Sequence, residues 1–366
     1  MVDFLIVLAK CFIVLFTVLN ASALLLWVER KGSALIQNRV GANRAAIFGI
    51  LPFNLGFVNT LLADPLKMFT KEDFIPAGAD RTIHTLAPFL ALFPALVTFA
   101  AIPFGDTIEI AGRTVELRAV DLDVGILYIV AMVAMGVYGV VLAGWASNNR
   151  WSLLGSIRGS AQMISYEVAL GLALVSMVLA YGTLDLQEMV RAQGGLLLGF
   201  LPAWGIFFQP VAAVIVFTSG MAESKRTPFD LPEAESELIS GYFTEYSGGK
   251  QATFMLADFA EVVVVAGLVT TLFFGGWQVP YLSSAGWTFP GLDPIAVSPW
   301  IVTVLQLGAF TVKVAFLAWL QWLIKWTVPR FRYDQLMNLG WKGMIPAALV
   351  NLLITAAVIL WVNRNA

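Results

Sequence analysis

Cysteine and histidine are nearly absent from the sequence, which contains one of each, Cys11 and His84. A cysteine-ligated iron–sulfur cluster, a bis-histidine haem and a multi-ligand zinc site all need more such side chains. We therefore expect the chain to bind no metal, haem or iron–sulfur cluster, so that any redox centre it works with belongs to a partner. We interpret Cys11 as a small apolar residue of a helix face and His84 as an interfacial side chain near Arg81.

Charge is scarce as well. Only 13% of the residues are charged and 59% are hydrophobic, and the mean hydropathy is +0.80. These values lie outside the range of soluble globular proteins and inside that of polytopic membrane proteins. We expect a lipid bilayer around the chain and no nucleic acid among its partners.

Long apolar runs are what the sequence has instead. A membrane-spanning helix needs about 20 mostly apolar residues, because its backbone polar groups must be satisfied within the segment. Eight windows qualify, at residues 4–28, 83–104, 124–144, 162–182, 196–220, 254–275, 301–323 and 344–362. We predict an all-α integral membrane protein with about eight transmembrane helices, forming a single polytopic membrane domain over residues 1–366.

The distribution of Lys and Arg predicts an orientation. Most of these residues lie in the first, third, fifth and seventh connections between windows. By the positive-inside rule these connections face the cytoplasm, which places both termini on the periplasmic side of a bacterial plasma membrane. The first connection, residues 29–82, is the longest and most basic, and "ERKGSALIQNRVGANR" predicts a short amphipathic helix on the inner membrane surface. Alternatively, its cations only set the topology.

Several ionisable side chains fall inside the windows: Glu167 in the fourth, Asp258 and Glu261 in the sixth, Lys10 in the first and Lys313 in the seventh. Such groups are functional candidates, because charge is costly inside a membrane. Asp258 and Glu261 share a helix face. Both they and Glu167 are expected near helix ends, where water reaches them, and Lys10 can extend to the outer surface.

The fifth connection is unusually acidic. The stretch "ESKRTPFDLPEAESELISGYFTEY", residues 223–246, contains six carboxylates, and Pro228 and Pro232 predict a non-helical inner loop there. Carboxylates held close together in a poorly solvated site keep protons near neutral pH, so they can store and relay them. The alternative is a fully solvated acidic loop with ordinary pKa values. The six residues are Glu223, Asp230, Glu233, Glu235, Glu237 and Glu245.

The seventh connection, "IKWTVPRFRYDQLMNLGWK", contains Arg330, Arg332 and Asp334 after Pro329. This pattern predicts a structured loop whose cations pair with the acidic loop across the inner face, although the topology rule by itself also explains them.

Together these motifs carry a family resemblance. "WVERK", "QNRVG", "ADPLKMFTKED", "SAQMISYEVALGLAL", the acidic stretch and "PRFRYDQLMNLGWK" occur in the order found in the quinone-site membrane subunits (H-type subunits) of respiratory complex I, the proton-translocating NADH:quinone oxidoreductase. The chain resembles that family along most of its inner side. The resemblance implies eight transmembrane helices, some of them similar to the half-channel bundle of antiporter-like subunits.

The resemblance also implies site residues. A tunnel would lead ubiquinone or menaquinone, as substrate, toward an iron–sulfur centre in a neighbouring hydrophilic subunit. Residues near that tunnel would be Glu29, Arg30, Asp64, Arg330 and Arg332. The acidic path that links quinone chemistry to the membrane arm would contain Glu167, Glu223, Asp230, Glu233, Glu235, Glu237 and Glu245, with Asp258 or Glu261.

Three positions depart from the family pattern. Ala42 replaces a proline, and the spacing to Asp64 is longer than usual, which affects the tunnel entrance around residues 42–63. The sixth-helix carboxylate is Asp258 rather than glutamate, and Glu261 is an extra acid on the same face, so either residue can hold that role. Lys325 stands where arginine is common, and lysine cannot form a bidentate contact.

The sequence predicts a complex I membrane subunit, not catalytic alone, that helps form the quinone tunnel and couples quinone reduction to proton translocation. Its partners would be hydrophilic iron–sulfur subunits and other membrane-arm subunits. One alternative is the membrane anchor of a related energy-converting hydrogenase or ferredoxin-linked complex. A more distant one is a stand-alone cation/proton antiporter.

Overall fold

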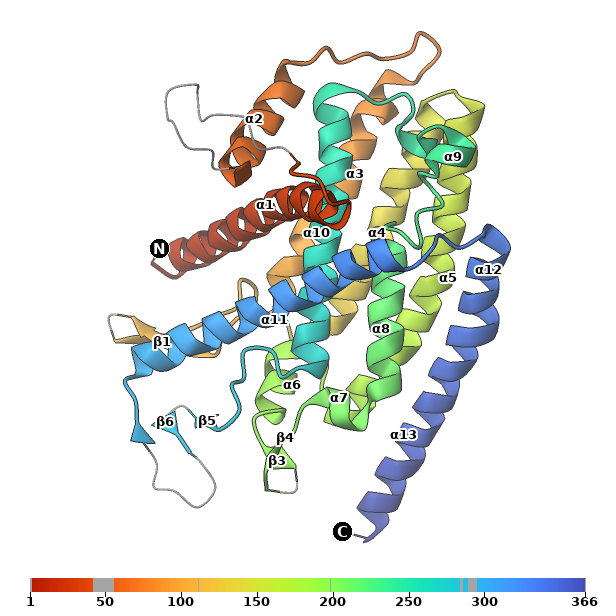
Figure 1. Ribbon diagram of the computed structural model, residues 1–366. Coiled ribbons are helices and arrows are strands. Elements are labelled where there is room, and N and C mark those ends of the chain that lie inside the picture. Colours follow the sequence, from red (N-terminus) through yellow and green to blue (C-terminus); the bar gives the residue numbers. More distant parts are fainter. Residues whose placement is uncertain are drawn as a thin grey trace.

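The computed structural model describes residues 2–41, 56–110, 112–197, 199–283, 286–288 and 295–365. Figure 1 shows a helical bundle with small β-hairpins at one end. The helices are α1 (Val2–Ile36), α2 (Gly56–Thr70), α3 (Arg81–Thr98), η2 (Phe99–Ala101), α4 (Gly125–Ala146), α5 (Arg150–Tyr181), α6 (Leu186–Ala192), α7 (Gly205–Phe208), α8 (Pro210–Glu223), α9 (Glu235–Leu238), η3 (Gly241–Phe243), α10 (Gly248–Phe273), α11 (Pro299–Thr327), α12 (Tyr333–Asn338), η4 (Leu339–Met344) and α13 (Ile345–Asn365).

The strands are short and antiparallel. β1 (Thr107–Ile110) pairs with β2 (Arg113–Glu116), and β3 (Leu196–Leu197) pairs with β4 (Leu201–Pro202). β5 (Leu282–Ser283), β6 (Gly286–Trp287) and β7 (Ile295–Ala296) form a third small sheet.

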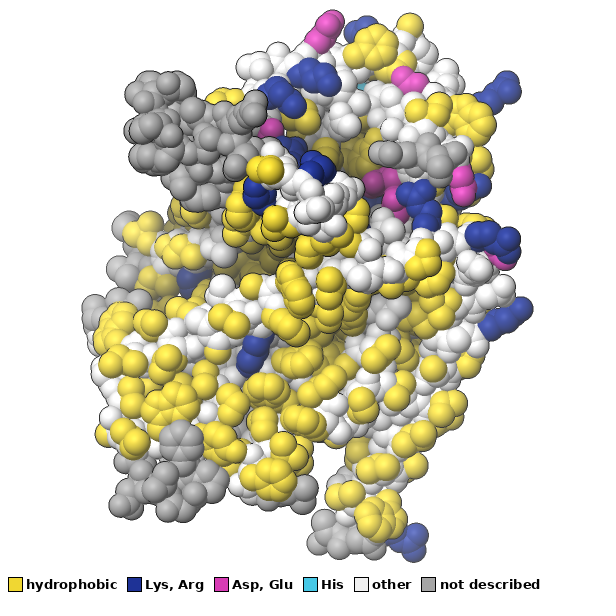
Figure 2. All heavy atoms as spheres, in the orientation of Figure 1, with side chains coloured by type: hydrophobic (Ala, Val, Ile, Leu, Met, Phe, Trp, Pro, Cys, Tyr) yellow, Lys and Arg dark blue, Asp and Glu magenta, His cyan; other side chains and the backbone are white. Residues whose placement is uncertain are grey.

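The predicted all-α membrane fold is confirmed. Within the described ranges, seven helical stretches are long and apolar enough to cross a membrane, and Pro210–Glu223 is a shorter apolar helix. Each of the eight predicted windows overlaps one of these helices. Figure 2 shows apolar side chains over most of the visible surface, whereas charged side chains gather toward the end where α2 and α9 lie.

Some boundaries were wrong. The fifth window, 196–220, begins with the β3–β4 hairpin and becomes helical only at α7 and α8, because Gly199, Pro202 and Pro210 interrupt the apolar run. The fourth helix begins at Arg150, well before residue 162, so Glu167 lies in the middle of α5 rather than near its end. The segment expected to form a surface helix continues α1 up to Ile36, and the short helix of that connection is α2.

Helix α10 is the centre of the bundle. It packs against α3, α1, α11 and α8, and most of its residues are buried. Helices α3, α4 and α5 form successive neighbours on one side, while α1 and α11 lie on the other (Figure 1). Asp258 is therefore buried, and both it and Glu261 lie in the middle of α10 rather than near its end as expected.

The last helix, α13, lies on α5 at the edge of the bundle (Figure 1). Asn351 of α13 donates hydrogen bonds to Ser176 and to Gln209, and Gln209 donates to Thr355 of α13 at 2.7 Å. Buried polar groups in an apolar medium strongly favour such partners. This polar cluster holds α13 in place.

Close helix packing at Gly139 supplies a test of the fold. A Cβ atom there would lie 2.6 Å from the backbone nitrogen of Ala91, so α4 can approach α3 only with glycine at this position. We expect Gly139→Leu to destabilise the purified chain by about 1–3 kcal/mol through overpacking. The measurement is thermal unfolding in detergent. Gly171→Ala on α5 is the matched control, since open space surrounds Gly171, and an equal loss in both variants would contradict this packing.

Candidate functional site

The acidic loop lies directly on α5. After α8 ends at Glu223, the chain turns through α9 and η3 before α10 begins, so the predicted non-helical conformation is confirmed over residues 224–234. A Cβ atom at Gly155 of α5 would lie 2.9 Å from the carbonyl oxygen of Pro232. At Gly241, where φ is +53°, a Cβ atom would lie 1.7 Å from that same oxygen. The two glycines allow the loop backbone to reach the helix.

The six loop carboxylates divide by burial. Glu223 is buried, Glu233 and Asp230 are partly buried, and Glu237 is exposed and pairs with Arg158 at 2.6 Å. The side chain of Glu235 lies outside the described set. The loop is thus neither a fully solvated acidic run nor a single buried cluster.

Carboxylates from four segments form a row. Glu223 lies within electrostatic reach of Glu167 on α5 and of Glu261 on α10. Glu233 lies within reach of Asp258 on α10 and of Asp230 in the loop. We call these six residues the acid row: Glu167, Glu223, Asp258, Glu261, Glu233 and Asp230. Asp230 also pairs with Arg330 at 2.5 Å, as the prediction for the seventh connection required.

Burial changes the ionisation of the loop groups. Burial, reinforced by Asp258 and Asp230, raises the pKa of Glu233 well above its ordinary value. For Lys225 burial alone would lower the pKa, but the carboxylates of Glu261 and Asp258 outweigh it and raise the pKa. The first shift favours the protonated form of Glu233 in the folded chain.

A large cavity lies between α1, α10 and α11. Its volume is about 700 Å³, and its walls are mainly apolar, with Phe259 and Val263 from α10 and Ala315 from α11 among them. One end is polar: there Glu29 forms ion pairs with Arg226 and with Lys325. The cavity is an apolar chamber with charge at one end.

The five predicted tunnel residues take different places. Glu29 lines the cavity, whereas Arg30 pairs with Asp64 at 2.5 Å. Arg330 faces the acid row, and Arg332 is 74% exposed and pairs with Asp334 in the first turn of α12. Ala42 and the rest of residues 42–55, where the tunnel entrance was expected to differ, lie outside the described residues.

Three cations complete the site, and the sequence did not assign them to it. Lys225 lies between Asp258 and Glu261, at 3.1 and 3.0 Å. Arg226 pairs with Glu29 and lies 3.8 Å above the ring of Phe259. Lys325, like Arg226, lines the cavity. The sequence signals were the position of Lys225 and Arg226 among the loop acids and the presence of Lys325 where arginine is common.

Two predicted intramembrane lysines make backbone contacts. Lys10 donates to the carbonyl of Glu116 at 3.2 Å. Lys313 donates to the carbonyls of Phe274, Gly276 and Gln278, at 2.7 to 3.0 Å. The contacts of Lys313 satisfy carbonyl groups just after the end of α10.

His84 is not interfacial as predicted. It is fully buried and stacks on Tyr246 with a ring separation of 4.0 Å, because η3 and the residues after it fold over the start of α3. Cys11 is half-buried on α1 and packs against the core, as expected for a small apolar residue. Within the described ranges no group of three or more Cys, His, Asp or Glu is arranged to hold a metal ion.

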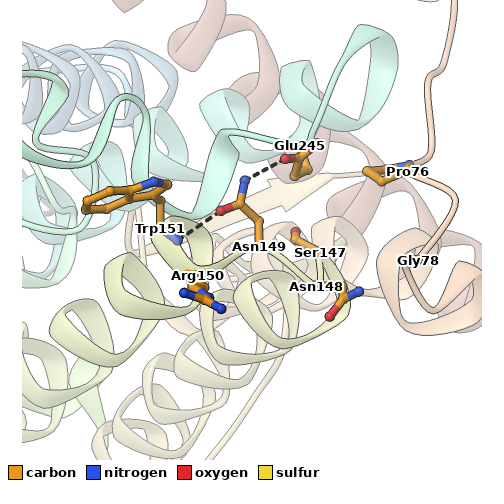
Figure 3. A pocket seen from close by; sticks show the side chains of 8 residues that line it. All are labelled: Pro76, Gly78, Ser147, Asn148, Asn149, Arg150, Trp151 and Glu245. Carbon is orange, nitrogen blue, oxygen red and sulfur yellow. Dashed lines mark hydrogen bonds between the residues drawn. The ribbon is translucent and has the colours of Figure 1, made fainter.

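Glu245 occupies a second, polar pocket of about 330 Å³ (Figure 3). Asn149 donates a hydrogen bond to Glu245 at 2.6 Å, and its side-chain oxygen accepts one from the backbone of Trp151 at 2.9 Å. Arg150 also lines this pocket. Glu245 thus has its own polar surroundings at the start of α5.

Comparisons with known proteins agree with this architecture. A family model described as NADH dehydrogenase matches residues 9–356. The chain is 45% identical to an H-type subunit of NADH-quinone oxidoreductase from Geobacter sulfurreducens, over 97% of this chain and 96% of that protein. It is 43% identical to an H-type subunit of the same oxidoreductase from Cytophaga hutchinsonii, over 91% of each chain. It is 40% identical to the corresponding protein of Bdellovibrio bacteriovorus, over 96% of this chain and 95% of the relative.

The raised pKa of Glu233 gives a pH dependence of stability. Folding favours its neutral form, so its contribution is fully present below the ordinary value of 4.5 and is lost as the pH rises through the folded-state pKa. As the pH rises from the ordinary value of 4.5 to the folded-state pKa, we expect the wild-type chain to lose stability relative to Glu233→Gln, by up to about 1.4 kcal/mol per pH unit. Thermal unfolding in detergent measures this. Glu237→Gln should follow the wild type, and a Glu233→Gln curve parallel to both would be inconsistent with a buried, protonated Glu233.

Proposed function

The chain belongs to the NADH dehydrogenase family, and from this premise we propose that it helps form the quinone-binding cavity of an NADH-quinone oxidoreductase and couples quinone reduction to proton translocation. As a member of this family it is a membrane subunit of that oxidoreductase, complex I. The relatives' names favour this over a hydrogenase anchor or an antiporter. The site supports the proposal in two parts, a cavity and an acid row.

The chamber between α1, α10 and α11 suits a quinone. Its volume of about 700 Å³ is within the usual range for small-molecule sites, and such sites combine apolar walls with a few polar groups. The ring of ubiquinone or menaquinone would lie near Arg226 and Lys325, whose N–H groups can donate to a quinone oxygen. These cations would stabilise the negative charge that develops on reduction.

Arg226 carries the coupling argument, because it belongs to both parts of the site. It pairs with Glu29 at the polar end of the cavity, and its charge also acts on Glu233 and Glu261 of the acid row. Negative charge on the quinone would compete with Glu29 for Arg226. A shift of Arg226 toward the quinone would withdraw positive charge from the acid row and favour proton uptake there.

Protons would then redistribute along the row from Glu233 through Glu223 to Glu167 in the middle of α5. Mid-helix carboxylates enclosed by protein are typical of proton pathways in membranes. We propose that Glu235, Glu237 and Glu245 serve the inner end of this path, where the loop meets the aqueous phase.

Partners supply the electrons in this proposal. A hydrophilic iron–sulfur subunit would lie against the charged end of the bundle and reduce quinone at the polar end of the cavity, while other membrane-arm subunits would receive the coupling from α5. The chain is a multi-pass membrane protein. We propose the bacterial plasma membrane as its location, with both termini on the periplasmic side.

The complex itself tests the assignment. The tagged chain, extracted gently from its native membrane, should bring with it iron–sulfur signals in electron paramagnetic resonance and NADH-driven, inhibitor-sensitive quinone reduction. Hydrogenase or ferredoxin activity in their place would indicate the related anchor. Isolation of the chain without iron, together with cation/proton exchange in liposomes, would indicate an antiporter.

Two glutamates test the proton path, one in the acid row and one exposed to solvent. We expect Glu233→Gln to reduce proton pumping by the assembled complex at least about tenfold, because a neutral amide cannot exchange a proton. The control is Glu188→Gln on α6, whose carboxylate is exposed and accepts a hydrogen bond from Thr183. Pumping in proteoliposomes is compared with quinone reduction in the same preparation. Equal pumping by both variants at parental rates would argue against the acid row.

Filling the cavity tests the quinone site. Ala315 lines the cavity, and Ala315→Trp should raise the KM for quinone about tenfold, which corresponds to about 1.4 kcal/mol of lost binding. Val312, one turn earlier on α11, is 68% exposed, and Val312→Trp is the control. Steady-state kinetics of the assembled complex measure both. An unchanged KM in Ala315→Trp would place quinone elsewhere.

A further inference from the structure

Lys225 is buried in contact with two carboxylates. Its side chain is 2% exposed, and its Nζ lies 3.1 Å from Asp258 and 3.0 Å from Glu261. The two acids are one helical turn apart on α10, and both face the end of α8. A lysine so fully removed from water needs such partners.

The backbone at Lys225 is also unusual. Its φ is +53°, in the left-handed region that is unfavourable for a residue with a side chain. The residue follows Ser224 at the C-terminal end of α8, where glycine is the ordinary choice. Lysine is therefore unfavourable for the backbone at this position, which suggests that its side chain has a function.

The charges of the three groups do not cancel. One ammonium faces two carboxylates, so with both acids ionised the group has a net charge of −1 inside the bundle. Further charged and titratable groups face it from neighbouring segments. They are Glu223 at the end of α8, Glu233 and Arg226 in the loop, and Tyr242 on η3. One proton on either acid would make the group of three neutral.

We propose that Lys225, Asp258 and Glu261 act as one unit that holds a single exchangeable proton of the acid row, with Lys225 as the positioning residue that decides which carboxylate carries it. The proposal rests on the proton-coupling function given above. A proton that arrives from Glu233 converts one carboxylate to a carboxylic acid, and Lys225 then pairs with the other. When the proton leaves toward Glu223, Lys225 again bridges both acids.

In this unit Asp258 and Glu261 share the role of the sixth-helix carboxylate, since both are needed. The contacts of Lys225 with the two acids are nearly equal in length. A small movement of its flexible chain therefore exchanges partners without removing the ammonium from its burial site. Glu261 and Lys225 belong together in the site, because each compensates the charge of the other.

The test is the pH dependence of proton pumping by the assembled complex in proteoliposomes. Lys225→Gln leaves two buried acids without a cation, so protons should be held more tightly. We expect its pH profile to move upward by about one unit, so that pumping at neutral pH is about tenfold slower. Glu261→Gln leaves a neutral pair, so its profile should move downward. The double variant, Lys225→Gln with Glu261→Gln, regains a net charge of −1 and should return toward the parental profile.

Lys225→Arg retains the charge and should rescue the profile that Lys225→Gln shifts. A role in packing alone would not shift the two single variants in opposite directions, nor would it predict rescue by the double variant. Parallel shifts in both single variants would overturn the proposal. Glu261→Gln and Lys225→Arg keep it testable if Lys225→Gln does not assemble.

The same preparations separate this inference from the function it rests on. If Lys225→Gln pumps with the parental profile while Glu233→Gln fails to pump, the acid row stands and the three-residue unit is wrong. If both variants pump at parental rates, the coupling function itself fails.

Discussion

The ion pair between Glu29 and Arg226 is the contact on which the rest of the site depends. It joins α1 to the loop after α8, and Lys325 of α11 completes it from a third element. A charge buried in a bundle must be paired, and removal of one partner leaves the other uncompensated at a cost of about 3–5 kcal/mol. The pair therefore fixes the relative positions of α1, α11 and the loop, and with them the cavity between those elements.

The loop after α8 contacts both the cavity and α10, because it is short and closely packed. Arg226 is turned toward the cavity, and Lys225, its neighbour in sequence, is turned toward α10. Gly155 and Gly241 bring the loop backbone against α5. The loop thus places one cation at the cavity and its neighbour in sequence among the acids of α10, so a single peptide bond joins the two parts of the site.

Hydropathy predicted the helices that are apolar throughout but not their polar extensions. Helix α5 begins at Arg150 because its first turns lie under the acidic loop, where Ser152, Ser156 and Arg158 are compatible with a helix although they lower the apolarity of the window. The acids of the row were recognisable by their residue types and by resemblance. The role of Lys225 was not, since its partner Glu261 lies 36 residues away and only the tertiary fold brings the two together.

The polar cluster at α13 has a consequence for biosynthesis. Gln209 emerges from the ribosome long before Asn351 and Thr355, and its side-chain amide lacks these partners until α13 is inserted. A chain without α13 would leave this amide without these partners inside the apolar bundle. The docking of α13 therefore removes the cost of an unsatisfied amide from the folding membrane domain.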